Sequence, residues 1–100
     1  MQATVTVTEG RAVIRLQGRF DFNAHRDFRE AVDAALAGPA TAIVVDFGGV
    51  EYLDSSALGM LLVLRDRAKA ATREVALTGC RGMVKQILDI ANFSKLFSID

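Results

Sequence analysis

The residues of this chain that could do chemistry are few, and three of them are consecutive: Asp54, Ser55 and Ser56. The chain also has one histidine, His25, and one cysteine, Cys80. A serine nucleophile needs a neighbouring base and a group that orients it, and hydrolases of the elbow type place a glycine two residues before the serine. That glycine is missing, and His25 falls on the polar side of an expected helix. The sequence therefore disfavours an acyl-transfer enzyme, and we assign no catalytic residue.

Cofactor and metal sites are disfavoured by the same inspection. The pair Gly48-Gly49 has neither the lysine of a phosphate-binding loop nor the spaced glycines of a dinucleotide fingerprint, so we interpret it as turn chemistry. One histidine, one cysteine and scattered carboxylates show no metal-ligand spacing. We interpret Cys80 as a buried filler at a strand end, with a reactive thiol as the alternative. We expect no cofactor and no metal.

The start of the apolar helix after Leu53 remains as a candidate site. A capping role explains one of the residues Asp54, Ser55 and Ser56, but not three in a row without a Glu or Gln to complete a capping box. Gly59 is unfavourable inside a helix, and it would make sense if the backbone of the chain's own sheet or of a partner approached closely. Ser56 is either a second acceptor or the cap.

A helix N-terminus also tolerates an anion. A phosphate on Ser55 would add a charge of roughly −1.5 to −2 without requiring the fold to change. A partner packed flat against this turn would then be released. We therefore hypothesise an electrostatic switch that works by blocking an interface.

The elements that position this helix start follow from hydrophobic periodicity. Residues 3–8 and 11–17 predict an antiparallel hairpin around Glu9-Gly10, with Gly18 as its end. A first helix follows the possible caps Asp21 and Asn23 and stops at Gly38-Pro39. Further segments are a strand at 41–47 covered on both faces and broken at Gly48-Gly49, a helix at 55–72 heavily buried in its first half, a strand at 74–78, a helix over 84–91 stopped by Asn92, and a strand stub at 98–100.

These segments give the order β-β-α-β-α-β-α-β. We expect an α/β fold with a mixed sheet of about four to five strands and three helices packed on it. The 100 residues fit a single domain spanning 1–100, and a hydrophobic fraction of 51% permits a packed core.

The charge of the chain is balanced. Twelve basic and twelve acidic residues cancel, so nothing favours the binding of nucleic acid. The chain shows no signal peptide, and the apolar run Met60–Leu64 is too short to insert into a bilayer, so we expect a soluble cytoplasmic protein.

The segment Asp46–Gly59 closely resembles the signature of STAS domains, specifically of bacterial anti-sigma factor antagonists. The stretches Leu16–Asp21 and Val84–Phe93 are similar to that family's second strand and third helix. The resemblance implies a STAS fold over the whole chain. It also implies that Ser55 is phosphorylated by a partner that is both serine kinase and anti-sigma factor, of the histidine-kinase-like ATPase type. The unphosphorylated form would bind that partner and free a sigma factor, and a serine phosphatase would reset the system.

By the same resemblance, Asp21 and Asp54 flank the acceptor hydroxyl, and the first turns of the second helix, with Ser56, Leu58 and Gly59, form the partner surface. The chain departs from the family at three places. Ala57 stands where many relatives have glycine, residues 70–73 lack an expected glycine, and the chain stops at Asp100, short of a final helix. The alternatives are a STAS subunit that is never phosphorylated, such as an accessory subunit of a lipid-transport complex, and a small-molecule-binding enzyme.

Overall fold

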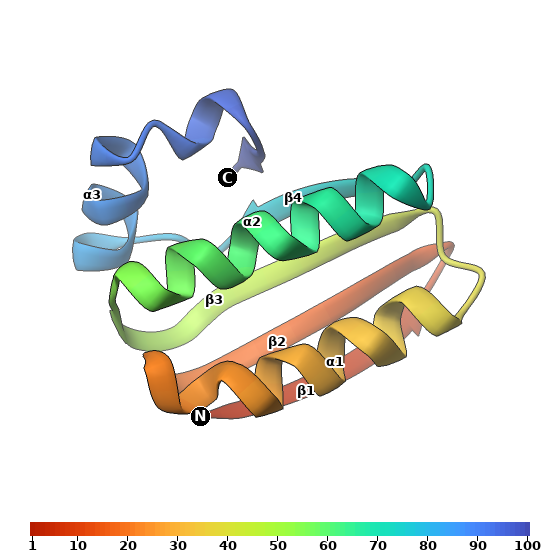
Figure 1. Ribbon diagram of the computed structural model, residues 1–100, viewed down its shortest axis with the longest axis horizontal. Helices are drawn as coiled ribbons and strands as arrows, with labels where there is room; N and C mark the ends of the chain where they lie inside the picture. Colours follow the sequence, from red (N-terminus) through yellow and green to blue (C-terminus); the bar gives the residue numbers. More distant parts are fainter.

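The computed structural model describes all 100 residues, and it has one five-stranded sheet in the order β1-β2-β3-β4-β5 (Figure 1). Strand β1 pairs antiparallel with β2, and the other three pairings are parallel. The mixed sheet with three α-helices that we expected is confirmed. The elements are β1 Gln2–Thr8, β2 Arg11–Phe20, η1 Phe22–Ala24, α1 His25–Ala37, β3 Ala42–Leu53, α2 Ser55–Ala70, β4 Glu74–Thr78, α3 Gly82–Ile90, η2 Phe93–Lys95 and β5 Ser98–Ile99.

The hairpin β1-β2 forms because its turn residues accept left-handed backbone angles. Glu9 has φ 52° and Gly10 has φ 78°, the combination that matches the twist of two-residue hairpins. Alternate residues of β2 then point to one face, where Ala12, Ile14 and Leu16 are fully buried. The predicted hairpin is confirmed, but its second strand continues past Gly18 to Phe20, with φ 100° at Gly18.

Helices cover only one face of the sheet. Figure 1 shows α1 and α2 side by side across the strands, with α3 standing beside the end of the sheet, where it contacts β3. Val44 points to the other face and lies outside the main core cluster, although it is only 6% exposed. It pairs with Val13 on β2 and Ala76 on β4, whose side chains share its face. The expectation of a central strand covered on both faces is therefore wrong, because strand neighbours shield Val44 and no second layer does.

The strand β3 also continues where a break was expected. It runs through Gly48-Gly49 to Leu53, because two register shifts against β2 let it carry extra residues without losing its pairing. The first shift separates the pairs Arg15↔Asp46 and Gln17↔Gly49, and the second separates Gly18↔Val50 and Arg19↔Tyr52. A side chain at Gly49 would lie 2.9 Å from the Leu16 carbonyl oxygen, so this glycine permits close strand pairing and does not end the strand.

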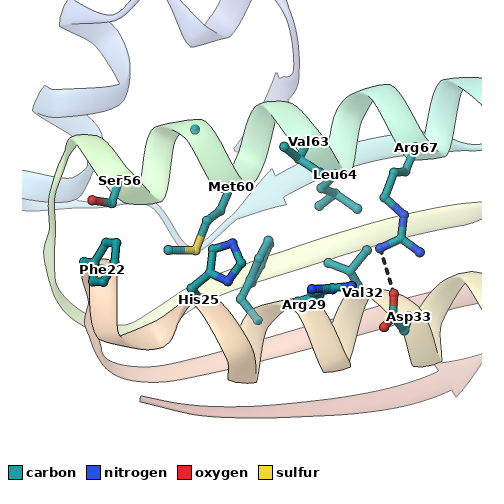
Figure 2. A pocket seen from close by; sticks show the side chains of 12 residues that line it. Phe22, His25, Arg29, Val32, Asp33, Ser56, Met60, Val63, Leu64 and Arg67 are labelled. Atoms are coloured by element: carbon teal, nitrogen blue, oxygen red, sulfur yellow. Dashed lines mark ion pairs between the residues drawn. The ribbon is translucent and has the colours of Figure 1, made fainter.

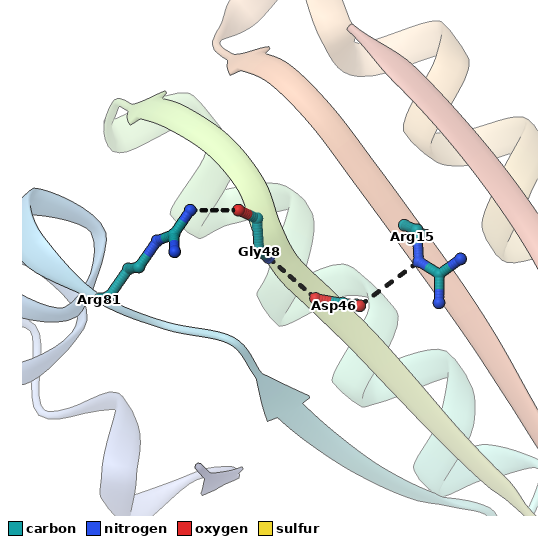
Figure 3. Close-up of polar contacts among 4 residues, drawn as sticks. All are labelled: Arg15, Asp46, Gly48 and Arg81. Carbon is teal, nitrogen blue, oxygen red and sulfur yellow. Dashed lines mark hydrogen bonds and ion pairs between the residues drawn. The ribbon is translucent and has the colours of Figure 1, made fainter.

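Polar contacts hold the bulged part of β3 on its open side (Figure 3). The Asp46 carboxylate accepts a hydrogen bond from the Gly48 backbone N–H at 2.8 Å and lies 3.5 Å from the Arg15 Nε. The Arg81 guanidinium donates to the Gly48 carbonyl oxygen at 2.7 Å. Because β4 pairs with β3 only as far as Asp46, Arg81 satisfies an acceptor that no neighbouring strand reaches.

The ends of two helices agree with the expected boundaries. Asn92 has φ 59° and follows α3 as a left-handed stop. Helix α2 ends in a Schellman motif, in which Thr72 N–H donates to Lys69 and Arg73 N–H donates to Ala68. Thr72 takes φ 59° in this motif, which explains why a glycine was expected in residues 70–73.

Candidate partner-binding surface

The site is built on the carboxyl ends of two neighbouring parallel strands. Phe20 at the end of β2 pairs with Leu53 at the end of β3, so the residues that follow them, Asp21 and Asp54, emerge at the same edge of the sheet. The Asp54 backbone N–H donates to the Phe20 carbonyl oxygen at 3.3 Å and ties the two ends together. The structure thus brings both predicted aspartates to one edge.

Each aspartate caps the helical element that follows it. The Asp54 carboxylate accepts from the Ala57 backbone N–H at 3.1 Å and caps α2. The Asp21 carboxylate accepts from the Asn23 backbone N–H at 3.0 Å and caps the short η1. Helix α1 has no side-chain cap of its own, so Asn23 is not a cap.

Because Asp54 is the cap, both serine hydroxyls are left free. Ser55 is the first residue of α2 and is exposed, and Ser56 is half-buried. Neither side chain makes a hydrogen bond within the chain, and the first N–H groups of a helix have no partners inside it. The possibility that Ser56 is the cap is thereby excluded. An exposed hydroxyl at this end lies where a negative charge is stabilised by free N–H groups.

Leu58 and Gly59 differ in their surroundings. Leu58 is half-buried and packs against the core. Gly59 is exposed, and a Cβ built on it would meet nothing within 4 Å. The chain's own sheet therefore does not explain the glycine.

A groove of about 680 Å³ runs between α1 and α2, and Ser56 and Gly59 lie in its wall (Figure 2). Figure 2 shows Phe22 nearest to Ser56, His25 beside Met60, and the ion pair of Arg67 with Asp33 at the other end. The complete lining is Phe22, His25, Phe28, Arg29, Val32, Asp33, Ser56, Gly59, Met60, Val63, Leu64 and Arg67.

The sequence-based predictions do not include this groove. The apolar first half of α2 predicts heavy burial, but Val63 is 57% exposed and Leu62 is 37% exposed. Phe22 is 72% exposed and was treated as part of a connection. An aromatic residue in a polar connection, together with a helix apolar nearly all round, was the available signal, since both leave more apolar surface than one sheet face can cover.

Other candidate groups carry no chemistry in this structure. Cys80 is buried after the end of β4, as expected, and burial raises its pKa to about 11, which keeps the thiol protonated and unreactive at neutral pH. His25 is exposed and makes no hydrogen bond to either serine. No three His, Cys, Asp or Glu side chains are grouped as a metal site would need. None of the helices has the length and apolar character needed to cross a membrane.

Comparisons of the sequence and of the fold with known proteins identify a family for this chain. Residues 3–98 match the family model described as "Mlab, STAS domain". A STAS-domain containing protein of Pseudomonas aeruginosa is 50% identical over 86 residues, which are 86% of this chain and 84% of that protein. An anti-sigma F factor antagonist of Lysinibacillus sphaericus is 34% identical over 71% of this chain and 62% of its own. The Bacillus cell fate determinant SpoIIAA, in its phosphorylated form, has the same fold, with a TM-score of 0.73 at 22% identity over 98% of this chain and 90% of its own.

Proposed function

The chain belongs to the STAS-domain family, and from that premise we propose that it is an anti-sigma factor antagonist switched by phosphorylation of Ser55. In this proposal the unphosphorylated form binds an anti-sigma factor that is also a serine kinase of the histidine-kinase-like ATPase type, and thereby frees a sigma factor. Phosphorylation releases the complex, and a serine phosphatase restores binding. The protein acts in the cytoplasm and is the substrate of the kinase, not a catalyst.

The observation that carries the proposal is the free hydroxyl of Ser55 on the first turn of α2. The hydroxyl is exposed and unbonded, and the capping role belongs to Asp54. A phosphate there would face the positive end of a 16-residue helix, so the fold would accept it. A partner in contact with this turn would have to desolvate a charge of roughly −1.5 to −2, which is unfavourable without a matching cation.

The surface around Ser55 supplies the remaining parts of the proposal. We assign Asp21, Asp54, Ser56 and Gly59 to the partner-binding surface, with Leu58 supporting it from the half-buried side of α2. The 34% identical relative is an anti-sigma F factor antagonist, and SpoIIAA is known in a phosphorylated form. The two descriptions support an anti-sigma factor antagonist that can be phosphorylated, and the assignment of the switch to Ser55 rests on the geometry of this chain.

The test is phosphorylation and binding with the anti-sigma factor kinase from the same genome. With ATP and Mg²⁺, we expect peptide mass spectrometry to find one phosphate on Ser55, retained in Ser56→Ala and lost in Ser55→Ala. Ser55→Asp should weaken binding on the order of 100-fold, which corresponds to roughly 2.7 kcal/mol. Phosphate on another residue, or undiminished binding by Ser55→Asp, would contradict the proposal.

The second candidate is a STAS subunit that is not phosphorylated, such as an accessory subunit of a lipid-transport complex. One observation favours it: the matched family model is described as "Mlab, STAS domain" and the 50% identical relative as a STAS-domain containing protein, and neither description names a sigma factor. Stable co-purification with a transporter ATPase, and no modification of Ser55 by the kinase, would support this candidate over the first.

A further inference from the structure

We propose that the groove between α1 and α2 seats an amphipathic helix of the partner, which lays apolar side chains on Val63 and Phe22 and presents a carboxylate to Arg29. The inference rests on the proposed function, since it specifies how that partner is held. It extends the contact surface from the first turn of α2 along the length of the groove.

The first support is the layering of apolar side chains in the groove. Its floor consists of core residues such as Phe28, which is 2% exposed, and Leu64, which is fully buried. Its rim carries Phe22 and Val63, which are 72% and 57% exposed. A large exposed aromatic beside a packed floor is typical of an anchor in a protein interface, and nothing in the chain covers it.

The second support is the shape of the α2 wall at Gly59. Glycine lowers the stability of a helix interior, and here no neighbouring group requires the absence of a side chain. Gly59 lies in the groove wall. Because it has no side chain, the wall is low at this position, and another helix can approach the α2 backbone closely. Small residues serve the same purpose wherever two helices pack tightly.

The third support is one unpaired cation. Arg67 is paired with Asp33 at 2.7 Å, and Arg26, which does not line the groove, is paired with Glu30 at 3.4 Å. Arg29 lies in the groove wall and forms no ion pair within the chain. A carboxylate on the occupant would complete the charge pattern, so we expect an acidic side chain among its apolar ones.

The fourth support is continuity with the switch. Ser56 and Val63 both lie in the groove wall and are seven residues apart, so they are separated by roughly 10 Å along α2. A helix that covers both would end over the turn that carries Ser55. An apolar groove that takes an amphipathic helix is a common mode of recognition, and a rigid occupant of this length would be displaced by a phosphate at its end.

The experiment measures the affinity of the cognate anti-sigma factor for wild type, for Ser55→Asp and for five further variants by isothermal titration calorimetry. We expect Val63→Asp to weaken binding about 30-fold and Arg29→Glu about 10-fold. Their controls, Ile90→Asp on α3 and Arg26→Glu on α1, likewise replace an apolar residue by an acid and an arginine by glutamate, at exposed sites outside the groove between α1 and α2. Both should stay within about twofold of wild type. Gly59→Gln is the fifth variant, and it should block the groove while favouring the helix.

The outcomes separate the two proposals. If wild type binds and Ser55→Asp releases it, but Val63→Asp, Arg29→Glu and Gly59→Gln all bind like wild type, the groove proposal is overturned and the proposed function stands. If wild type does not bind, or Ser55→Asp binds undiminished, the proposed function fails and the groove proposal fails with it. Should Val63→Asp unfold, Gly59→Gln and Arg29→Glu still decide the matter, because both positions are exposed.

Discussion

The residues that follow β2 and β3 form two copies of one backbone arrangement, an extended aspartate that caps a helical turn, but the side chains after the two aspartates differ. Asp21 has φ −121° and ψ −170°, and Asp54 has φ −115° and ψ −177°. Each follows a buried strand residue, each caps a helical turn, and each is followed three residues later by a buried alanine, Ala24 or Ala57. The residue directly after the cap differs: it is the exposed Phe22 in one copy and the exposed Ser55 in the other.

The same backbone arrangement therefore presents an aromatic ring at one position and a hydroxyl at the other. The β2 end leads into the short η1, which holds an aromatic side chain out of the core. The β3 end leads directly into a long helix, whose positive end lies at the Ser55 hydroxyl. Pairing of Phe20 with Leu53 keeps the two ends side by side, so in our proposal a phosphate on Ser55 would disturb a partner held at Phe22.

The largest loss of stability should come from truncating the two buried residues that precede the caps. Phe20→Ala should lower the free energy of unfolding by about 4 kcal/mol and Leu53→Ala by about 3 kcal/mol. Phe20 is expected to matter more because its ring lies 4.9 Å from that of Phe28 and 6.2 Å from that of Phe47. Urea denaturation followed by circular dichroism measures both. A smaller loss for Phe20→Ala than for Leu53→Ala would show that the β3 end is the stronger support.

Removal of the two caps should cost less stability than truncation of the buried residues. Asp54→Ala should cost about 1 kcal/mol of stability and Asp21→Ala about 0.5 kcal/mol, because Asp54 caps sixteen helical residues and Asp21 caps three. Urea midpoints measure the two losses. Asp54→Asn keeps a side-chain oxygen for the Ala57 N–H and should stay close to wild type. Equal losses for both alanine variants would mean that the two copies are also equivalent in energy.

The third comparison lies five residues after each cap, where α1 has Arg26 and α2 has Gly59. Gly59→Ala should raise the free energy of unfolding by about 0.8 kcal/mol, since its new Cβ meets no atom within 4 Å. Arg26→Ala exchanges one good helix former for another and should lower it by only about 0.3 kcal/mol through loss of the Glu30 pair. Thermal melts of both variants measure this. Destabilisation by Gly59→Ala would mean that the glycine serves the fold and not a partner.

Local patterns predicted most of the elements. Alternation in β1 and β2, the apolar stripe of α1 and the left-handed stop at Asn92 all depend on neighbours within a few residues. The Asp54-Ser55-Ser56 segment indicated a candidate site because a helix cap needs only one polar residue, which left two serines without a structural role. The continuation of β3 was missed because bulges change the spacing of its inward residues Phe47, Val50 and Leu53 from two to three.

The groove could not be predicted by such patterns. Its rim residues Phe22 and Val63 are 41 positions apart in the sequence, and only the packing of α1 against α2 places them together. The same holds for the placement of Asp21 and Asp54 at one edge of the sheet, which the family resemblance implied but no local periodicity contains. Tertiary arrangement, not composition, decides which apolar residues of α2 are left uncovered.

The two bulges of β3 have a consequence for how this segment can change in length. Phe47, Val50 and Leu53 all face the helices at a spacing of three, because each register shift adds one residue to the two that regular alternation needs. Deletion of one bulge residue, Gly48 or Glu51, would restore regular alternation there and leave Leu53 facing the core. Loss of one residue in this segment should therefore be absorbed by loss of a bulge, so the direction of Leu53, and with it the position of Ser55 at the edge of the sheet, is buffered against small changes in strand length.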